Sequence, residues 1–433
     1  MARPASGSSR DILAWALYDF ANSPFTTLVV TFIYATYFTQ AVPGGVERGT
    51  VLWSRGVTIT GLAVAVLSPV LGALADRGGF RKLFLVATTA ICIAGTAALY
   101  WVDPIHVVAA LACFVIANVA FETAEVFYNA FLPDIAPPDR IGRVSGIGWG
   151  LGYAGGLVAL VVALVALVQP ETPWFGFSKE GSENIRATNL IVAAWFALFS
   201  LPIFLVLRED KSRITRQGSI TREAYRQLRD TFVEIRRYRQ IVRLLLARLF
   251  YNDGLITVFA FGGIYAAGTF GFTFEEILVF GIVLNVAAGA GAFALGWVDD
   301  RLGGKRTIVI SLWGLTAAAL LAVLAPSKAL FWVAGIAVGI FAGPNQSASR
   351  SLLGRLVPPD KENEFFGFFA FSGKATAFLG PLVLGVLTQL FGSQRVGVSV
   401  VVVLLLIGYL LLRGVDEEAG IRAAGRYRAS IAP

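Results

Sequence analysis

The sequence predicts an all-α integral membrane protein with twelve transmembrane helices in two pseudo-symmetric six-helix halves. Three observations lead to this fold class. Hydrophobic residues make up 56% of the 433 residues and charged residues only 15%, with a mean hydropathy of +0.70, whereas about a quarter of the residues of a soluble protein are charged. Apolar runs long enough to cross a bilayer recur along the chain. A polar, glycine-rich loop occurs once in each half.

Each predicted span is an apolar run of about the 20 residues that a bilayer-crossing helix needs, or longer. The first run is long and lacks a small-residue cleavage site, so we expect it to remain as the first spanning helix. Turn signals rich in Pro, Gly and Asp follow many of the runs. The predicted spans cover roughly 13–40, 51–75, 82–102, 105–132, 141–168, 188–207, 241–270, 275–298, 307–325, 328–354, 363–390 and 395–413.

The repeated loop lies at 72–82 and again at 296–306, 224 residues further along the chain. A second repeat, Pro137-Pro138-Asp139 and Pro358-Pro359-Asp360, has an offset of 221 residues and joins the fourth span to the fifth and the tenth to the eleventh. The two repeats therefore relate two halves of the same orientation, as in transporters built from parallel repeats. In the first loop the shared residues are Gly72, Asp76, Arg77, Gly79, Arg81 and Lys82, and in the second Gly296, Asp300, Arg301, Gly303, Lys305 and Arg306.

Basic residues set the orientation, because cytoplasmic loops carry an excess of Lys and Arg. When residues near the end of a span are counted with the adjacent loop, six of the 36 Lys and Arg residues fall on one side, two (Arg248 and Lys374) fall deep within spans, and the remaining 28 fall on the other side. This bias predicts that both termini are cytoplasmic. The same distribution assigns the net charge of +8 to a membrane surface and not to a nucleic-acid partner.

The chain divides into a first half (1–207), a linker (208–240), a second half (241–413) and a cytoplasmic tail (414–433). The linker is rich in Arg and places Ala224, Leu228 and Phe232 at helical spacing. We expect an amphipathic basic helix on anionic lipids of the inner leaflet; a solvated charged linker is the alternative.

Several classes of function are not supported by the sequence. Cys92 and Cys113 lie inside apolar runs, as small buried hydrophobic residues do. His106 is the only histidine, and no cluster of ligands has metal-binding spacing. No Walker-type phosphate loop and no nucleophile–base set is present. We therefore expect no enzyme activity, no metal and no cofactor.

The repeated loop resembles the signature of the major facilitator superfamily, Gly-x-x-x-Asp-Arg/Lys-x-Gly-x-Arg/Lys-Arg/Lys, at 72–82 and in the second half at 296–306. The resemblance implies the major facilitator fold and a charge latch that holds the cytoplasmic side shut in the outward-open state. Glycine permits close helix contact. Asp76 and Asp300 can cap the N-terminus of a neighbouring helix or pair with an Arg of the other half.

Four further stretches, at 15–25, 127–133, 346–351 and 365–374, resemble the branch that includes the autophagy-linked vacuolar effluxers and their bacterial relatives. The vacuolar members are associated with amino-acid export, and this resemblance extends the expectation to amino-acid-like solutes. Short loops and the lack of long acidic termini favour a bacterial plasma membrane over a vacuole. In this fold the first, fourth, seventh and tenth helices line the cavity.

Five charged residues fall at a depth of about 12–16 Å within the spans, on a rise of about 1.5 Å per residue. They are Asp19, Glu122, Glu125, Asp253 and Lys374. Charges at this depth are costly and mark functional sites by default. Two carboxylates as close as Glu122 and Glu125 disfavour joint ionisation, so one can hold a proton for coupling. The alternative is a buried ion-pair network that only fixes packing. Arg248 is expected to reach the inner surface.

Amides on the same spans complete the candidate site: Asn22, Asn118, Asn252, Asn345 and Gln346. We expect a secondary active transporter that moves a small polar solute, such as an amino acid, by alternating access coupled to protons. An exporter of drugs or amphiphiles and a non-transporting receptor or scaffold are the alternatives. The expected partners are membrane lipids, a small-molecule solute and protons, with no nucleic acid, and the chain is expected to act as a monomer.

Overall fold

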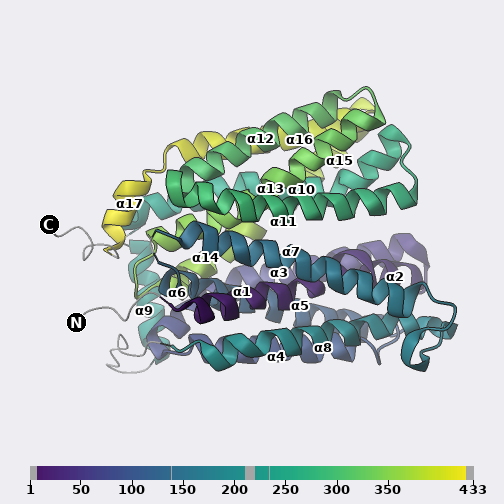
Figure 1. Cartoon of the computed structure of the whole chain (residues 1–433), viewed down its shortest axis with the longest axis horizontal. Coiled ribbons are helices and arrows are strands. Elements are labelled where there is room, and N and C mark those ends of the chain that lie inside the picture. The colour runs from purple at the N-terminus through teal and green to yellow at the C-terminus, as the bar shows by residue number, and fades with distance from the viewer. Residues whose placement is uncertain (1–6, 138, 210–219, 234, 426–433) are drawn as a thin grey trace.

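The computed structural model describes residues 7–137, 139–209, 220–233 and 235–425. Residues 210–219 and 234 of the predicted linker, and 426–433 of the predicted tail, lie outside the described residues. Within the described part the chain is helical and contains no strand. The helices form an elongated bundle of two layers, with α1 to α8 in one and α10 to α13, α15 and α16 in the other, while α14 lies between them against α3 (Figure 1). The predicted all-α membrane fold is confirmed.

The first half begins with α1 (Ser9–Pro24), which a capping box of Ser8 and Asp11 starts. Its other elements are η1 (Phe25–Phe32), α2 (Tyr34–Ala41), α3 (Gly45–Gly78), α4 (Arg81–Ala98), α5 (Val107–Ala130), α6 (Leu132–Ile135), α7 (Ile141–Ala163), η2 (Leu164–Val168), η3 (Trp174–Gly176), η4 (Glu180–Ser182) and α8 (Glu183–Val206). The linker contributes α9 (Ile220–Val233) and η5 (Ile235–Tyr238).

The second half contains α10 (Arg239–Phe270), α11 (Phe274–Leu302), α12 (Gly304–Leu324), α13 (Lys328–Leu356), α14 (Glu362–Lys374), α15 (Leu379–Phe391) and α16 (Gln394–Arg413), and α17 (Glu417–Ala424) follows it. The start of α1, the linker helix α9 and α17 all lie at the same end of the bundle (Figure 1). This end also carries the two repeated loops, and we refer to it as the inner end.

Eleven helical segments of the described residues are long and apolar enough to span a membrane, one fewer than predicted. The difference lies in the first predicted span, 13–40, which is divided into α1, the π-helical segment η1 and α2. Pro24 ends α1, and because proline has no N–H and disfavours a regular helix behind it, the hydrogen-bond pattern shifts here. The first span is thus a chain of three shorter elements.

The eleventh predicted span, 363–390, is also interrupted. Helix α14 ends at Lys374 and α15 begins at Leu379. The Gly380 backbone N–H at the start of α15 finds a partner within the protein, the Asp253 carboxylate (3.0 Å), and the Thr376 side-chain hydroxyl ties the interrupted segment to the Leu249 carbonyl of α10 (2.8 Å). Non-helical backbone at membrane depth is tolerated where protein buries it.

Each half is built around its own apolar core, Val126 and Ala130 of α5 pack with the core of the second half, and glycines line two of the contacts between the halves. At the first, α7 packs on α11, where Gly146 faces the Ala292 carbonyl and Gly150 the Gly289 carbonyl. At the second, Gly72 of α3 faces the Asn363 carbonyl at the start of α14. A Cβ atom on Gly72 or Gly146 would collide with backbone, so these positions need glycine for the close approach.

Candidate functional site

The two loop aspartates each cap a helix of the opposite half. Asp76 accepts hydrogen bonds from the Asn363 backbone N–H (3.1 Å), the Asn363 side-chain amide (2.6 Å) and the Glu364 N–H (2.9 Å), all at the start of α14. An anion at a helix N-terminus satisfies free N–H groups and interacts favourably with the helix dipole. The sequence left open whether Asp76 caps a helix or pairs with an Arg of the other half, and in the structure it caps α14.

Asp300 occupies the equivalent place for α7. It accepts from the Gly142 N–H (2.8 Å), the Arg143 N–H (3.1 Å) and the Arg143 side chain (Nε to Oδ2, 2.8 Å). Asp300 therefore combines both predicted possibilities, the cap and the ion pair with an Arg of the other half. The two caps are related by the internal repeat, and each of them joins one half to the other at the inner end.

Basic residues of the repeated loops have unequal surroundings. Arg81 is buried and pairs with Asp134 of its own half (2.7 Å) and with Glu362 of the other half (3.2 Å). Lys82 donates to the Leu207 carbonyl and Lys305 to the Val415 carbonyl, which fastens each loop to the end of its own half. Arg77 is half-buried, whereas Arg301 and Arg306 are exposed. Only some of the loop charges therefore contribute to closure.

A buried ion pair lies deeper, between α1 and α13. Asp19 accepts from Arg350 (3.1 Å), whose side chain is 3% exposed. The guanidinium also donates to the Asn129 side chain (3.1 Å) and to the Ser145 backbone carbonyl (2.7 Å) and hydroxyl (2.9 Å). By its place in the sequence, Arg350 belongs with the basic residues of the inner surface. The structure corrects this: Arg350 is a buried partner of the site.

Three aromatic rings surround the same guanidinium. Its central carbon lies 4.7 Å from the Trp15 ring centroid and 5.7 Å from those of Tyr128 and Trp149. Such distances permit cation–π attraction. We call Trp15, Tyr128, Trp149 and Asp19 the aromatic cage.

A second ion pair joins α5 to α14. The Lys374 ammonium lies 2.6 Å from the Glu122 carboxylate, and the two side chains are 33% and 18% exposed. The pair joins the two halves, since Glu122 lies on α5 and Lys374 on α14. Glu122 is therefore the carboxylate partner of Lys374, and this pair is more accessible than the pair of Asp19 and Arg350.

Glu125 has amides and no cation as direct partners. Its carboxylate accepts from Asn22 of α1 (2.6 Å) and more weakly from Asn129 of its own helix (3.4 Å). Among the described residues no Lys or Arg lies within ion-pair distance of it. Glu125 is nevertheless close enough to Asp19, Arg350 and Glu122 for their charges to interact. Within the described part of the chain Glu125 therefore has no cation as a direct partner, while the charges of two other carboxylates act on it.

Arg248 does not reach the inner surface, contrary to the expectation. It is 7% exposed and donates to the Phe369 carbonyl (2.8 Å) and the Ser372 hydroxyl (3.0 Å), with its guanidinium 3.6 Å from the Phe369 ring centroid. The cause is α14, whose end folds over this side chain. Arg248 is close enough to Glu122 for their charges to interact, so it extends the charged layer into the second half.

The amides of the second half divide between two environments. Asn252 donates to the Gly373 carbonyl (3.1 Å) and accepts from Gln346 (3.1 Å), beside Lys374. Asn345 instead donates to Ser311 of α12 (3.0 Å), away from the other half. Asn118, on the same helix as Glu122, is buried.

Asp253 differs from its predicted place in the cavity. It is 1% exposed and accepts from the Gly380 N–H at the start of α15. The break between α14 and α15 supplies this partner, which the sequence does not show. Asp253 therefore caps a helix within its own half and stands apart from the cross-half pairs.

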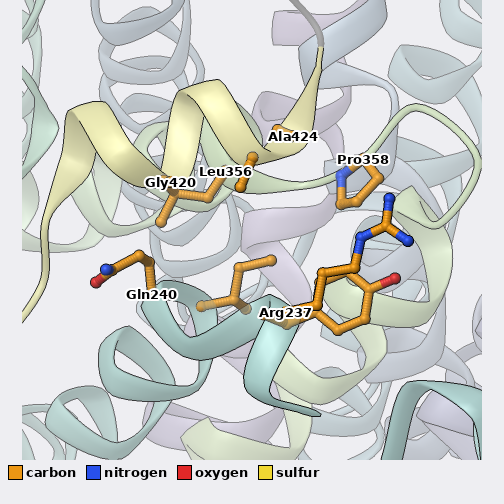
Figure 2. A pocket seen from close by; sticks show the side chains of 9 residues that line it. Arg237, Gln240, Leu356, Pro358, Gly420 and Ala424 are labelled. Carbon is orange, nitrogen blue, oxygen red and sulfur yellow. The ribbon is translucent and has the colours of Figure 1, made fainter. Parts of the chain in front are cut away.

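A small pocket at the inner end is separate from these charges. Apolar and backbone atoms around Tyr238, Ile241, Leu356, Pro358 and Gly420 line most of it, with Arg237 at its edge (Figure 2). Among the described residues no group of three or more His, Cys, Asp or Glu side chains could hold a metal ion. The charged layer between the halves is thus the candidate site.

Comparison with known proteins adds sequence relatives. Residues 50–425 match the family described as vacuole effluxer Atg22 like. The MFS-type transporter YxiO of Bacillus subtilis is 29% identical over 94% of both chains. Autophagy-related protein 22-1 of Neosartorya fischeri is 26% identical over 67% of this chain, which spans about half (51%) of that relative.

Solved structures with the same fold are more distant in sequence. The transporter FucP in its outward conformation has a TM-score of 0.72 at 16% identity and covers 94% of this chain and 98% of its own. The human organic anion transporter MFSD10 has a TM-score of 0.71 at 16% identity, with 93% and 99% covered. At such identities the likeness establishes the fold.

Proposed function

Because the chain belongs to the vacuole effluxer Atg22-like family of major facilitator transporters, we propose that it carries a small polar solute, such as an amino acid, across the membrane by alternating access coupled to protons. It is a multi-pass membrane transporter of the major facilitator type. The solute, the coupling ion and the direction of transport are the proposed part.

The observation that carries the proposal is the pair of Lys374 and Glu122, which joins the two halves at mid-depth. A buried charge stays inside a membrane protein only with a partner, so separation of the halves here leaves both charges in need of another partner. A zwitterionic solute offers a carboxylate to Lys374, and a proton can neutralise Glu122. The partial exposure of Glu122 and Lys374 supports access by water and by such a solute.

Proton coupling is proposed at Glu125 together with Glu122. Glu125 has only amide donors, and the negative charges of Asp19 and Glu122 act on it. A carboxylate without a cation and near other carboxylates is the group whose protonation costs least. Binding of a proton would release Asn22 from its charge-assisted bond and loosen α1 from α5, which links protonation to helix movement.

Reconstituted liposomes test the proposal. Uptake of labelled amino acids is measured with and without an imposed pH gradient, first for the unmodified chain and then for Glu122→Gln and Glu125→Gln. We expect gradient-driven uptake that Glu125→Gln uncouples while exchange down a solute gradient persists. Uptake that ignores the pH gradient, or coupled transport that survives both substitutions, contradicts the coupling.

The remaining expectations form part of the same proposal. We place the protein in a bacterial plasma membrane with both termini cytoplasmic, acting as a monomer. Helix α9 buries Ala224, Gln227 and Thr231 against the protein, with Gln227 bonded to Glu364 (2.5 Å). The face of α9 that points away from the protein is therefore the one that we expect to contact anionic lipids. If a drug or amphiphile and no amino acid stabilises the purified protein, the exporter alternative replaces transport of an amino acid.

A further inference from the structure

Arg350 belongs to the second half, yet its side chain is bound by the first. Its guanidinium donates to Asp19, Asn129 and Ser145, which lie on α1, α5 and α7. All three of the surrounding rings, Trp15, Tyr128 and Trp149, also belong to the first half. The guanidinium is therefore held in the aromatic cage as a ligand is held in a site.

The cage is built without help from Arg350. Trp15 stacks on Tyr128 with centroids 4.6 Å apart and an interplanar angle of 14°. The Trp15 indole N–H donates to the Tyr128 carbonyl (3.0 Å), and Tyr18 stacks on Tyr128 from another side (4.8 Å). These contacts lie within the first half, so they persist when the second half moves.

Space for the guanidinium depends on a glycine. A Cβ atom on Gly148 of α7 would lie 2.6 Å from the Asp19 carboxylate, 2.9 Å from the Arg350 Nη2 and 2.9 Å from the Trp15 ring. The absence of a side chain at Gly148 thus keeps the cage open beside the carboxylate. The Asp19 side chain is 11% exposed, against 3% for Arg350, so Asp19 is the more accessible partner of the pair.

A carboxylate beside aromatic faces is the chemistry that recognises organic cations. A guanidinium or alkylammonium ion gains both charge pairing and ring contact, whereas a small metal ion requires several oxygen ligands. Opening of the inner end carries α13 away from α1 and α7, which takes the Arg350 cation away from Asp19 and lets water and solutes reach the carboxylate. A carboxylate that has lost its cation and still lies beside three aromatic rings favours another organic cation in its place.

We propose that the aromatic cage binds the ammonium or guanidinium group of the transported solute when α13 has withdrawn, and that Arg350 takes its place when the inner end closes. The inference rests on the proposed transport function and names the cation subsite of that site. Occupation by Arg350 and by the solute are mutually exclusive. The protein's own side chain thereby expels the solute's cationic group as the inner end shuts.

The first test uses the purified full chain with Arg350→Ala and the probes methylguanidinium and tetramethylammonium. Calorimetry is expected to show saturable binding at least about tenfold tighter than for the unmodified chain, in which Arg350 competes. Adding Asp19→Asn should weaken this binding about tenfold or more, since a charge-assisted contact is lost, and adding Trp15→Leu should weaken it several-fold. Arg350→Lys keeps a cation in the cage and should bind the probes as weakly as the unmodified chain. No binding to Arg350→Ala, or binding that Asp19→Asn leaves intact, overturns the inference.

The second test keeps Arg350 and so does not depend on the folding of the variant. Spin labels are placed on exposed Asp139 and Glu418, whose side chains are 72% and 86% exposed and which flank the inner end of opposite halves. Tetramethylammonium should increase the population with the longer distance, because it binds the state with Arg350 withdrawn; an unchanged distribution contradicts the proposal.

The two proposals fail separately. If liposomes show no uptake but Arg350→Ala binds the probes, the cation subsite stands and the solute proposal is wrong. If uptake is normal and the probes do not bind, only the subsite is wrong.

Discussion

Asp76→Asn tests the idea that the loop caps hold the inner end shut. Asp76 accepts three hydrogen bonds from α14, at 3.1, 2.6 and 2.9 Å. Bonds to a charged acceptor contribute about 1.5–3 kcal/mol each and neutral ones about 0.5–1.5 kcal/mol. Asparagine keeps a single acceptor oxygen and turns its NH₂ group toward a donor. We therefore expect a loss of about 3 kcal/mol from the inner-closed state, a shift of about 150-fold in the equilibrium between closed and open.

Double electron–electron resonance on the label pair at Asp139 and Glu418 measures this equilibrium, in a background in which Cys92 and Cys113 are replaced. Asp76→Asn should make the longer distance a major population. Asp300→Asn should have a similar effect, because it caps α7 in the equivalent way. Asp230→Asn is the matched control, since Asp230 is half-exposed and, within the described part of the chain, its side chain bonds to the adjacent Arg229. An unchanged distance distribution for both caps would refute the reasoning.

The same substitution separates the gate from the solute site. Asp76 has no contact with Glu122 or Lys374, so Asp76→Asn should slow the transport cycle and leave the solute affinity nearly unchanged. Separate values of kcat and KM in liposomes distinguish the two effects. A large loss of affinity would show that the inner loops and the charged layer are not separate in function.

Three further predictions concern packing and charge. Gly72→Ala places a Cβ against the Asn363 carbonyl and should favour the open inner end in the same resonance measurement, whereas Gly61→Ala, which meets nothing within 4 Å, should not. Lys374→Met leaves Glu122 without its cation and should lower the free energy of unfolding by about 1.5–3 kcal/mol, less than for a fully buried pair because both side chains are partly exposed. The double variant with Glu122→Gln should recover most of this loss, and a double variant as unstable as the single one would exclude the pairing as the cause. Glu417 caps α12 by accepting hydrogen bonds from the Gly304 and Lys305 N–H groups (3.0 and 2.9 Å). Glu417→Gln should lower the free energy of unfolding by about 1–2 kcal/mol, as measured in a thermal melt, whereas Glu418→Gln at an exposed position should cause no measurable loss.

The inner loops were largely predictable from the sequence, because a repeated order of glycine and charge limits what the loop can do. Gly72 and Asp76 are one helical turn apart, so a close approach at one brings the other to the facing helix. The depth of Glu122 and Lys374 followed from counting residues along their helices. Their pairing is expected because two opposite charges at the same depth stabilise each other.

Arg350 was not predictable by the same reasoning. It lies six residues before the end of α13, where a positive charge looks like any other residue of the inner surface. One signal was available: it ends the run Asn345-Gln346-Ser347-Ala348-Ser349-Arg350, which is unusually polar for a span. Asp253 and Arg248 show a different limit. The partners of Arg248 lie on the last turns of α14, and the partner of Asp253 lies at the start of α15, beyond the break after Lys374. Apolar periodicity locates neither the fold of α14 over Arg248 nor the break.

The reciprocal caps provide a reporter that needs no label. Asp76 and Asp300 together protect four backbone amides, those of Asn363, Glu364, Gly142 and Arg143. These amides lie in the first turns of α14 and α7, where no intrahelical acceptor is available to them. Their hydrogens can exchange with solvent only when the inner end opens. Deuterium uptake in two short peptides, 139–144 and 361–366, would therefore follow the opening of the unmodified transporter, and the two peptides should exchange together if both halves separate as rigid bodies.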